Sequence, residues 1–159
     1  MAKSGERMDR VDLALIRVLE KDARISFTEL ADRLGLSKTP VWKRVKALEA
    51  EGVITDYIAR LDPKELGFGL EAFIAVTIDF KAAEEFEAAV LAHPSVWRCH
   101  AMTGDADYSL HVLARDMEDM DRLIRREIAR LPGVDRTKSS VITRAVKRGQ
   151  SLAELAERR

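Results

Sequence analysis

The stretch that decides the fold is residues 26–52, SFTELADRLGLSKTPVWKRVKALEAEG. It holds two segments with apolar residues at helical spacing, and a single glycine lies between them. Ser26 and Glu29 predict a capping box at the start of the first helix, and Gly35 predicts a left-handed cap at its end. Ser37 is the expected N-cap of the second helix. Two short helices joined by a tight glycine turn are typical of a helix-turn-helix.

The flanking residues extend this motif to a domain. Upstream, apolar residues at helical spacing predict a helix over roughly residues 9–21. Downstream, residues 53–61 are rich in β-branched and aromatic residues, which indicates a strand or wing. We therefore expect residues 1–60 to form a three-helix, winged helix-turn-helix domain. Residues 61–69, with one proline and two glycines, are the expected linker.

Residues 70–150 alternate between strand and helix patterns. The expected elements are a strand over 72–80, a helix near 82–93, strands near 96–103 and 107–114 around a tight hairpin at 104–106, a helix over 117–131 and a strand over 135–147. This β-α-β-β-α-β order predicts a ferredoxin-like sandwich. The fold class is therefore α+β, and residues 151–159 are expected to form a short tail helix.

Composition narrows the classes of function. The chain has 27 basic and 27 acidic residues, so its net charge alone does not indicate a nucleic-acid partner. The single cysteine, Cys99, excludes an internal disulfide, and no Cys/His pair has zinc spacing, so no metal or cofactor is expected. No nucleophile–base set is apparent, so neither an enzyme nor a catalytic residue is expected. No signal segment or span of ~20 apolar residues occurs, and we expect a cytoplasmic protein without membrane contact.

The second helix of the motif carries the candidate DNA contacts. In a helix-turn-helix this helix enters the major groove with its N-terminal end first. Its basic residues all precede Glu49 and Glu51, so positive charge gathers at the end that would approach phosphate. Double-stranded DNA is the expected partner. The residues expected to lie at the interface are Ser37, Lys38, Thr39, Trp42, Lys43, Arg44 and Lys46.

Each residue type suggests a role. Ser37 and neighbouring backbone N–H groups are expected to hold a phosphate, while Thr39 and Trp42 are expected to contact thymine methyls or sugars. The expected phosphate contacts, with one guanine contact among them, are Lys43, Arg44 and Lys46. The alternative is a solvated basic face on an ordinary three-helix domain, with Trp42 packed inside.

Two motifs carry a resemblance to a known family. Residues 36–54 resemble the recognition segment of the Lrp/AsnC regulators, the feast/famine proteins. Residues 102–108, Met-Thr-Gly-Asp-Ala-Asp-Tyr, are similar to the family's Thr-Gly-Asp-x-Asp-Tyr signature. Residues 8–24 and 61–69 also fit, and the resemblance spans about residues 8–150.

The resemblance implies a transcriptional regulator that senses an amino acid in its C-terminal domain. It implies homodimers formed by pairing of the sheets, which assemble into tetramers or octamers. The effector would lie between dimers, near the hairpin of one subunit and the start of a neighbour's last strand. The implied effector residues are Thr103, Gly104, Asp105, Asp107 and Tyr108, with Thr137, Ser139 and Ser140 opposite.

The chemistry of these residues suits a free amino acid. Asp105 or Asp107 would pair with its ammonium group, while hydroxyls and backbone N–H groups would hold its carboxylate. The alternative is that both aspartates only shape the turn.

Two further functions stay open. One is an architectural protein that wraps DNA with little effector dependence. The other is a small enzyme on a ferredoxin-like sheet, because a fold does not fix a function. A basic helix at residues 37–51 would have no use in that enzyme.

Overall fold

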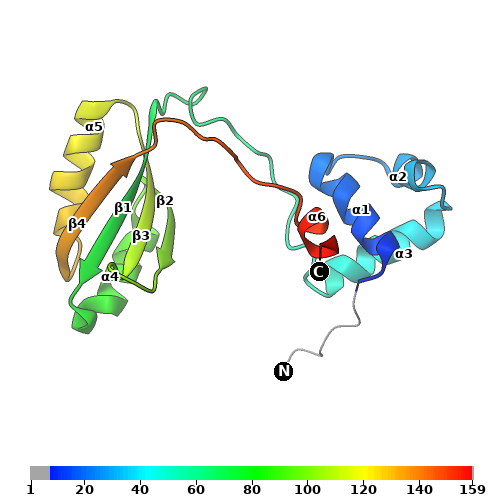
Figure 1. Cartoon of the computed structure of the whole chain (residues 1–159), viewed down its shortest axis with the longest axis horizontal. Helices are drawn as coiled ribbons and strands as arrows, with labels where there is room; N and C mark the ends of the chain where they lie inside the picture. Colours follow the sequence, from blue (N-terminus) through cyan, green and yellow to red (C-terminus); the bar gives the residue numbers. More distant parts are fainter. Residues whose placement is uncertain (1–7, 159) are drawn as a thin grey trace. The chain divides into compact units, whose positions relative to one another are not determined.

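The computed structural model describes residues 8–158 and divides them into two compact units (Figure 1). The N-terminal unit runs to Ala59 and also includes the chain from Val146 onward. The second unit is Arg60–Ala145. The chain therefore passes twice between the units.

The N-terminal unit contains three helices in the expected order, α1 (Arg10–Lys21), α2 (Phe27–Leu34) and α3 (Lys38–Ala50). Gly35 ends α2 in the left-handed region with φ +64°, which is the cap that the sequence predicts. The buried core residues are Leu15, Leu30, Ala31, Val41 and Val45. Val41 and Val45, one helical turn apart, thus hold α3 against α1 and α2.

The caps differ in detail from the sequence prediction. Ser26 accepts a hydrogen bond from the backbone N–H of Glu29 at 3.1 Å, but the Glu29 carboxylate pairs with Arg33 at 2.7 Å. The predicted capping box is thus half formed. Ser37 is the N-cap of α3 as predicted, although its side chain makes no capping hydrogen bond.

Residues 53–61, expected to form a strand or wing, contain no strand. A strand requires a neighbour that supplies the other half of its hydrogen bonds, and the described chain offers this segment none. The residues of this segment that favour strands therefore do not form one, because no neighbouring strand is present to pair with them. Ile58 and Leu61 are left exposed.

A fourth helix, α6 (Leu152–Glu157), completes the N-terminal unit. The Glu20 carboxylate of α1 accepts hydrogen bonds from the Ser151 hydroxyl and from the backbone N–H of Leu152, the latter at 2.7 Å. Arg17 forms an ion pair with Glu157, and Ala153 is buried. The tail helix therefore packs on α1 through contacts at both of its ends.

The second unit has the predicted β-α-β-β-α-β order. Its main elements are β1 (Leu70–Ile78), α4 (Ala83–Ala92), β2 (Val96–Ala101), β3 (Tyr108–Ala114), α5 (Met117–Arg122) and β4 (Val134–Val141). The sheet order is β2-β3-β1-β4, and every neighbouring pair is antiparallel. Figure 1 shows α4 and α5 along the sheet. This is the ferredoxin-like arrangement.

The sheet has one face covered by helices and one open face, and successive residues of each strand point to opposite faces. Ala72, Ile74 and Val76 of β1 are buried with Phe86 of α4 and Met120 of α5. The intervening side chains lie on the opposite face.

Three predicted ends in this unit are wrong. The strand expected over 72–80 ends at Ile78, and Phe80, expected on its buried face, is exposed in a 3-10 turn. The helix expected over 117–131 changes after Arg122 into a π-helical turn, Leu123–Glu127, and a 3-10 turn, Ile128–Arg130. The last strand ends at Val141 and not at residue 147, because its antiparallel partner β1 begins at Leu70 and the register starts with Ala72 opposite Val141.

Candidate nucleic-acid interface and effector site

The buried stripe of α3 leaves a polar and aromatic face in solvent. Val41, Val45 and Leu48 are buried, whereas Trp42 is 46% exposed. Lys38, Thr39 and Lys43 are also exposed. Neither lysine has a hydrogen bond or ion pair with any residue of the described chain. The N-terminal half of α3 thus presents two unpaired positive charges beside an indole ring.

Lys46, further along α3, is already paired. Its Nζ lies 2.6 Å from a carboxylate oxygen of Glu49, and the other oxygen of Glu49 accepts the Tyr57 hydroxyl at 2.9 Å. The contact with Lys46, and then that with Tyr57, lowers the pKa of Glu49. Burial and the glutamate raise the pKa of Tyr57 to about 12.

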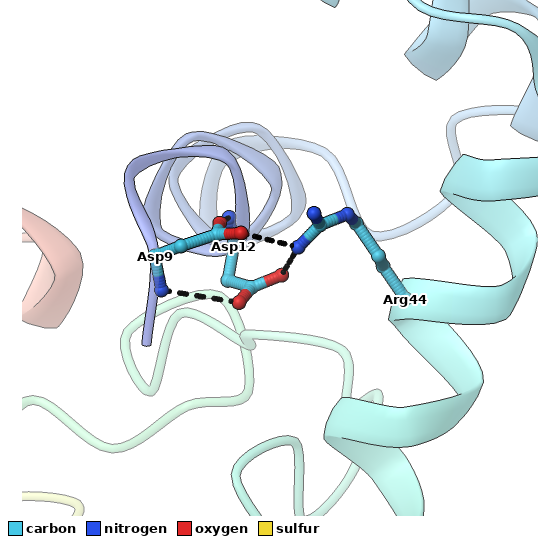
Figure 2. A network of polar contacts seen from close by, with 3 residues as sticks. All are labelled: Asp9, Asp12 and Arg44. Carbon is cyan, nitrogen blue, oxygen red and sulfur yellow. Dashed lines mark hydrogen bonds and ion pairs between the residues drawn. The ribbon is translucent and has the colours of Figure 1, made fainter. Parts of the chain in front are cut away.

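Arg44 is also paired, with the start of α1. Its Nη1 donates to Asp9 Oδ2 and to Asp12 Oδ1, both at 2.7 Å (Figure 2). The same aspartates form a capping box, with Asp12 N to Asp9 Oδ1 at 2.8 Å and Asp9 N to Asp12 Oδ2 at 3.2 Å. The sequence gives no sign of this contact, because Arg44 lies 32 and 35 positions from its partners.

Two of the predicted effector residues line a concave surface. A concavity of about 600 Å³ lies between the β2–β3 hairpin and the edge strand β4. It is lined by Ala75, Thr77, Asp105, Ala106, Arg136, Thr137 and Lys138. The structure therefore brings Asp105 together with Thr137. It adds Arg136 and Lys138, which lie opposite Thr77 and Ala75 in the β1–β4 register.

Asp107 supports the hairpin itself. Its Oδ2 accepts the backbone N–H of Ile78 at 2.9 Å, and its own N–H donates to the Val76 carbonyl at 3.0 Å. Its carbonyl accepts the Met102 N–H at 2.8 Å, which closes the loop. This carboxylate therefore links the hairpin to the end of β1.

Tyr108 belongs to the core. It is 6% exposed, its ring lies 4.7 Å from that of Phe86, and its hydroxyl donates to Glu87 Oε1 at 2.7 Å. The hydrogen bond to Glu87 and burial raise its pKa to about 12.

The other predicted effector residues do not line the concavity. Thr103 and Gly104 are exposed in the hairpin, and Gly104 has φ +129°. Ser139 lies opposite Ile74 on the covered face, and Ser140 lies opposite Phe73 on the open face. Sequence reasoning missed Arg136 and Lys138, although their alternate positions on an edge strand would have placed them on one face.

The open face of the sheet carries an aromatic cluster. The His111 ring lies 4.7 Å from that of Phe73 and 4.9 Å from that of Trp97, and the Arg98 guanidinium lies over Trp97 at 4.8 Å. Phe73 and Trp97 are both exposed. The open face therefore has two exposed aromatic side chains in contact with one histidine.

Comparison with known proteins assigns both units. Residues 8–55 match a family model described as winged helix-turn-helix DNA-binding, and residues 71–152 match the Lrp/AsnC ligand binding domain. The chain belongs to the Lrp/AsnC family. It is 38% identical to the leucine-responsive regulatory protein of Salmonella typhimurium, across 94% of this chain and 93% of that protein. The resemblance seen in the sequence is thereby confirmed.

Solved Lrp/AsnC structures share the fold. A transcriptional regulator from Neisseria meningitidis in complex with L-methionine has a TM-score of 0.86 and 34% identity, covering 91% of this chain and 96% of that one. A feast or famine regulatory protein from M. tuberculosis complexed with L-methionine has a TM-score of 0.80 and 33% identity, covering 90% and 98%. This Lrp/AsnC protein is therefore a transcriptional regulator with a DNA-binding domain and a ligand-binding domain. Among its described residues, no helix is long and apolar enough to cross a membrane.

Proposed function

We propose that this regulator binds an amino acid in the concavity beside the hairpin and that binding changes its hold on DNA. Two solved relatives carry L-methionine, which supports this class of effector. The observation that carries the proposal is the opposed charge of the lining, with Asp105 on one side and Arg136 and Lys138 on the other. An ammonium group would pair with Asp105, and a carboxylate with the basic pair.

Asp105 is the better partner for the ammonium group of the two aspartates considered. Asp107 Oδ2 already accepts the Ile78 N–H, whereas Asp105 has no bonded partner among the described residues. The turn-shaping role weighed for both aspartates is thus supported for Asp107. Tyr108 acts within the core, and Thr137 lines the site.

DNA would meet the N-terminal half of α3. Lys38 and Lys43 are unpaired and would neutralise phosphates, while Thr39 and Trp42 would contact bases or sugars. Ser37, whose side chain makes no capping bond, would hold a phosphate together with backbone N–H groups. Lys46 would contribute less, because a phosphate must compete with Glu49 for it.

Self-association would use the open face of the sheet. Phe73 and Trp97 are exposed on either side of His111, and we infer that a two-fold dimer buries them. A dimer places two copies of α3 on a pseudo-palindrome, with half-sites about one helical turn (~34 Å) apart. Further assembly to tetramers or octamers would bring Ser139 and Ser140 of a neighbour to the effector.

We assign no catalytic step to this chain. Two of its three histidines have evident structural contacts. His93 accepts the Ser95 N–H at 3.2 Å and lies 3.2 Å from Glu127, and the His111 ring lies between two aromatic rings that are tilted against it.

The test is thermal unfolding of the full-length protein against each of the common amino acids. A ligand at ~100 times its dissociation constant stabilises the folded state by about 2.7 kcal/mol, which gives a clear rise in the melting temperature. We expect L-methionine or a similar amino acid to give this rise. Asp105→Asn should abolish it, and Glu118→Gln, which removes an exposed charge on α5, should keep it. A flat panel at concentrations where the protein is assembled would contradict an amino-acid effector.

A further inference from the structure

Arg44, Asp9 and Asp12 form a compact ionic group, here called the acidic clamp (Figure 2). One nitrogen, Nη1, bridges the two carboxylates. The Asp12 side chain is only 18% exposed, so this contact is partly shielded from water. The clamp joins the middle of α3 to the first turn of α1, beside the apolar contacts that already pack these helices.

The clamp carries more negative than positive charge. Two carboxylates surround one guanidinium, which leaves a surplus of one negative charge. The hydrogen bond from the Asp12 backbone, reinforced by Arg44, lowers the pKa of Asp9, so this charge persists at neutral pH. A phosphate approaching this side of α3 would be repelled, whereas Lys38 and Lys43 have no carboxylate partner in the described chain.

We propose that Arg44 is a positioning residue and not a DNA contact. Through the clamp it fixes α3 on α1, and the surplus negative charge directs the DNA backbone away from this side of α3 and toward the unpaired Lys38 and Lys43. This replaces the phosphate contact that the sequence suggests for Arg44. The inference rests on the proposed use of α3 as the helix that reads DNA.

The salt dependence of DNA binding tests whether Lys43 contacts a phosphate and Arg44 does not. Each phosphate neutralised by a basic residue contributes about 0.9 to the slope of log K against log salt concentration. The probe is duplex DNA of random sequence, and the protein is the full-length chain. Lys43→Gln, one position away, is the matched control and should reduce the slope by about 0.9.

The first variant is Arg44→Gln combined with Asp9→Asn, which leaves the net charge of the clamp unchanged. Asparagine is also a good N-cap, so α1 keeps its start. We expect the wild-type slope together with a lower melting temperature. A slope reduced by about 0.9, as for Lys43→Gln, would make Arg44 a phosphate contact and overturn the inference.

The second variant, Asp9→Asn with Asp12→Asn, frees Arg44 and removes the negative charge. We expect the slope to steepen by about 0.9 and binding to random DNA to tighten. The matched control, Asp32→Asn with Glu51→Gln, removes two exposed charges elsewhere and should steepen the slope less. If the clamp were purely structural, this double variant and its control would have equal slopes, and that result would overturn the inference. An unchanged slope in Lys43→Gln would instead count against the proposed DNA contacts of α3.

Discussion

Tyr57 and Tyr108 are the two tyrosines of the chain, and the hydroxyl of each donates to a glutamate. The negative charge of the acceptor opposes loss of the phenolic proton, as does burial of the ring. Both pKa values are accordingly raised to about 12. The two side chains lie in different units, so one titration reports on both folds.

We predict that the folded protein forms almost no phenolate at pH 10, whereas about half of the tyrosine ionises in the unfolded chain. Because the folded pKa is raised, the stabilisation is complete below about pH 10 and is lost as the pH rises through about 12. Ultraviolet absorbance of the phenolate, with and without denaturant, measures this. Half-ionisation near pH 10 in the native protein would mean that the two glutamate contacts are absent.

We expect substitutions of Asp105 and Asp107 to differ in their effect on the stability of the protein. Asp107→Ala leaves the Ile78 N–H without its partner, so we expect a loss of about 1–3 kcal/mol in the free energy of unfolding. Asp105→Ala should change stability by less than about 0.5 kcal/mol, because its side chain has no partner in the described structure. Urea denaturation measures both. Equal losses would show that Asp105 also holds the hairpin.

The candidate sites were partly predictable from residue types. The helical period correctly predicts which residues of α3 are exposed, because it depends only on the local sequence. These residues are Lys38, Thr39, Trp42 and Lys43. The pairing of Arg44 was not predictable, because it depends on how α1 crosses α3. The sequence also gives no means of deciding which of two neighbouring aspartates faces inward.

At the scale of elements, helices were predicted best. The expected helix at 9–21 is Arg10–Lys21 in the structure, because apolar period and caps act within a few residues. Strand ends depend on distant partners, which explains the errors at residues 53–61 and at the end of β4. The π-helical turn at Leu123–Glu127 has no pattern in the sequence that we recognise.

The turn before β4 is packed tightly enough to test. Gly133 has φ +68°, and a Cβ there would lie 2.6 Å from the Cβ of Ala82. We predict that Gly133→Ala destabilises the protein by more than the about 1–2 kcal/mol that the left-handed backbone alone costs. Gly35→Ala is the matched control, since Gly35 has φ +64° with no atom within 4 Å of that position. Equal losses by urea denaturation would rule out a clash at Gly133.

At the scale of the whole molecule, the C-terminal segment of the chain runs from the proposed effector site to the DNA-binding unit. Strand β4 carries Thr137 of the effector site, and the chain then returns to end as α6 on α1. Neither family match assigns a role to residues 153–158. The tail helix therefore belongs to the DNA-binding unit, although neither family model covers residues 153–158.

Truncation after Ala145 should weaken the N-terminal unit alone. It removes two hydrogen bonds to Glu20 and the burial of Ala153, and each hydrogen bond contributes about 1 kcal/mol net. We expect a loss of about 1–3 kcal/mol in that unit, with the sheet unit unchanged. Hydrogen exchange resolved by segment measures the two separately. Unchanged protection of α1 would show that α6 does not stabilise it.

The central claim is that an amino acid in the hairpin site controls DNA binding by α3. The most direct measurement is the affinity for DNA fragments selected from genomic DNA, with and without the saturating amino acid found by thermal unfolding. Coupling between two sites is typically 1–3 kcal/mol, so we predict a change of about fivefold or more that is lost in Asp105→Asn. Equal affinities with the ligand fully bound would contradict the claim and leave an architectural DNA-binding protein.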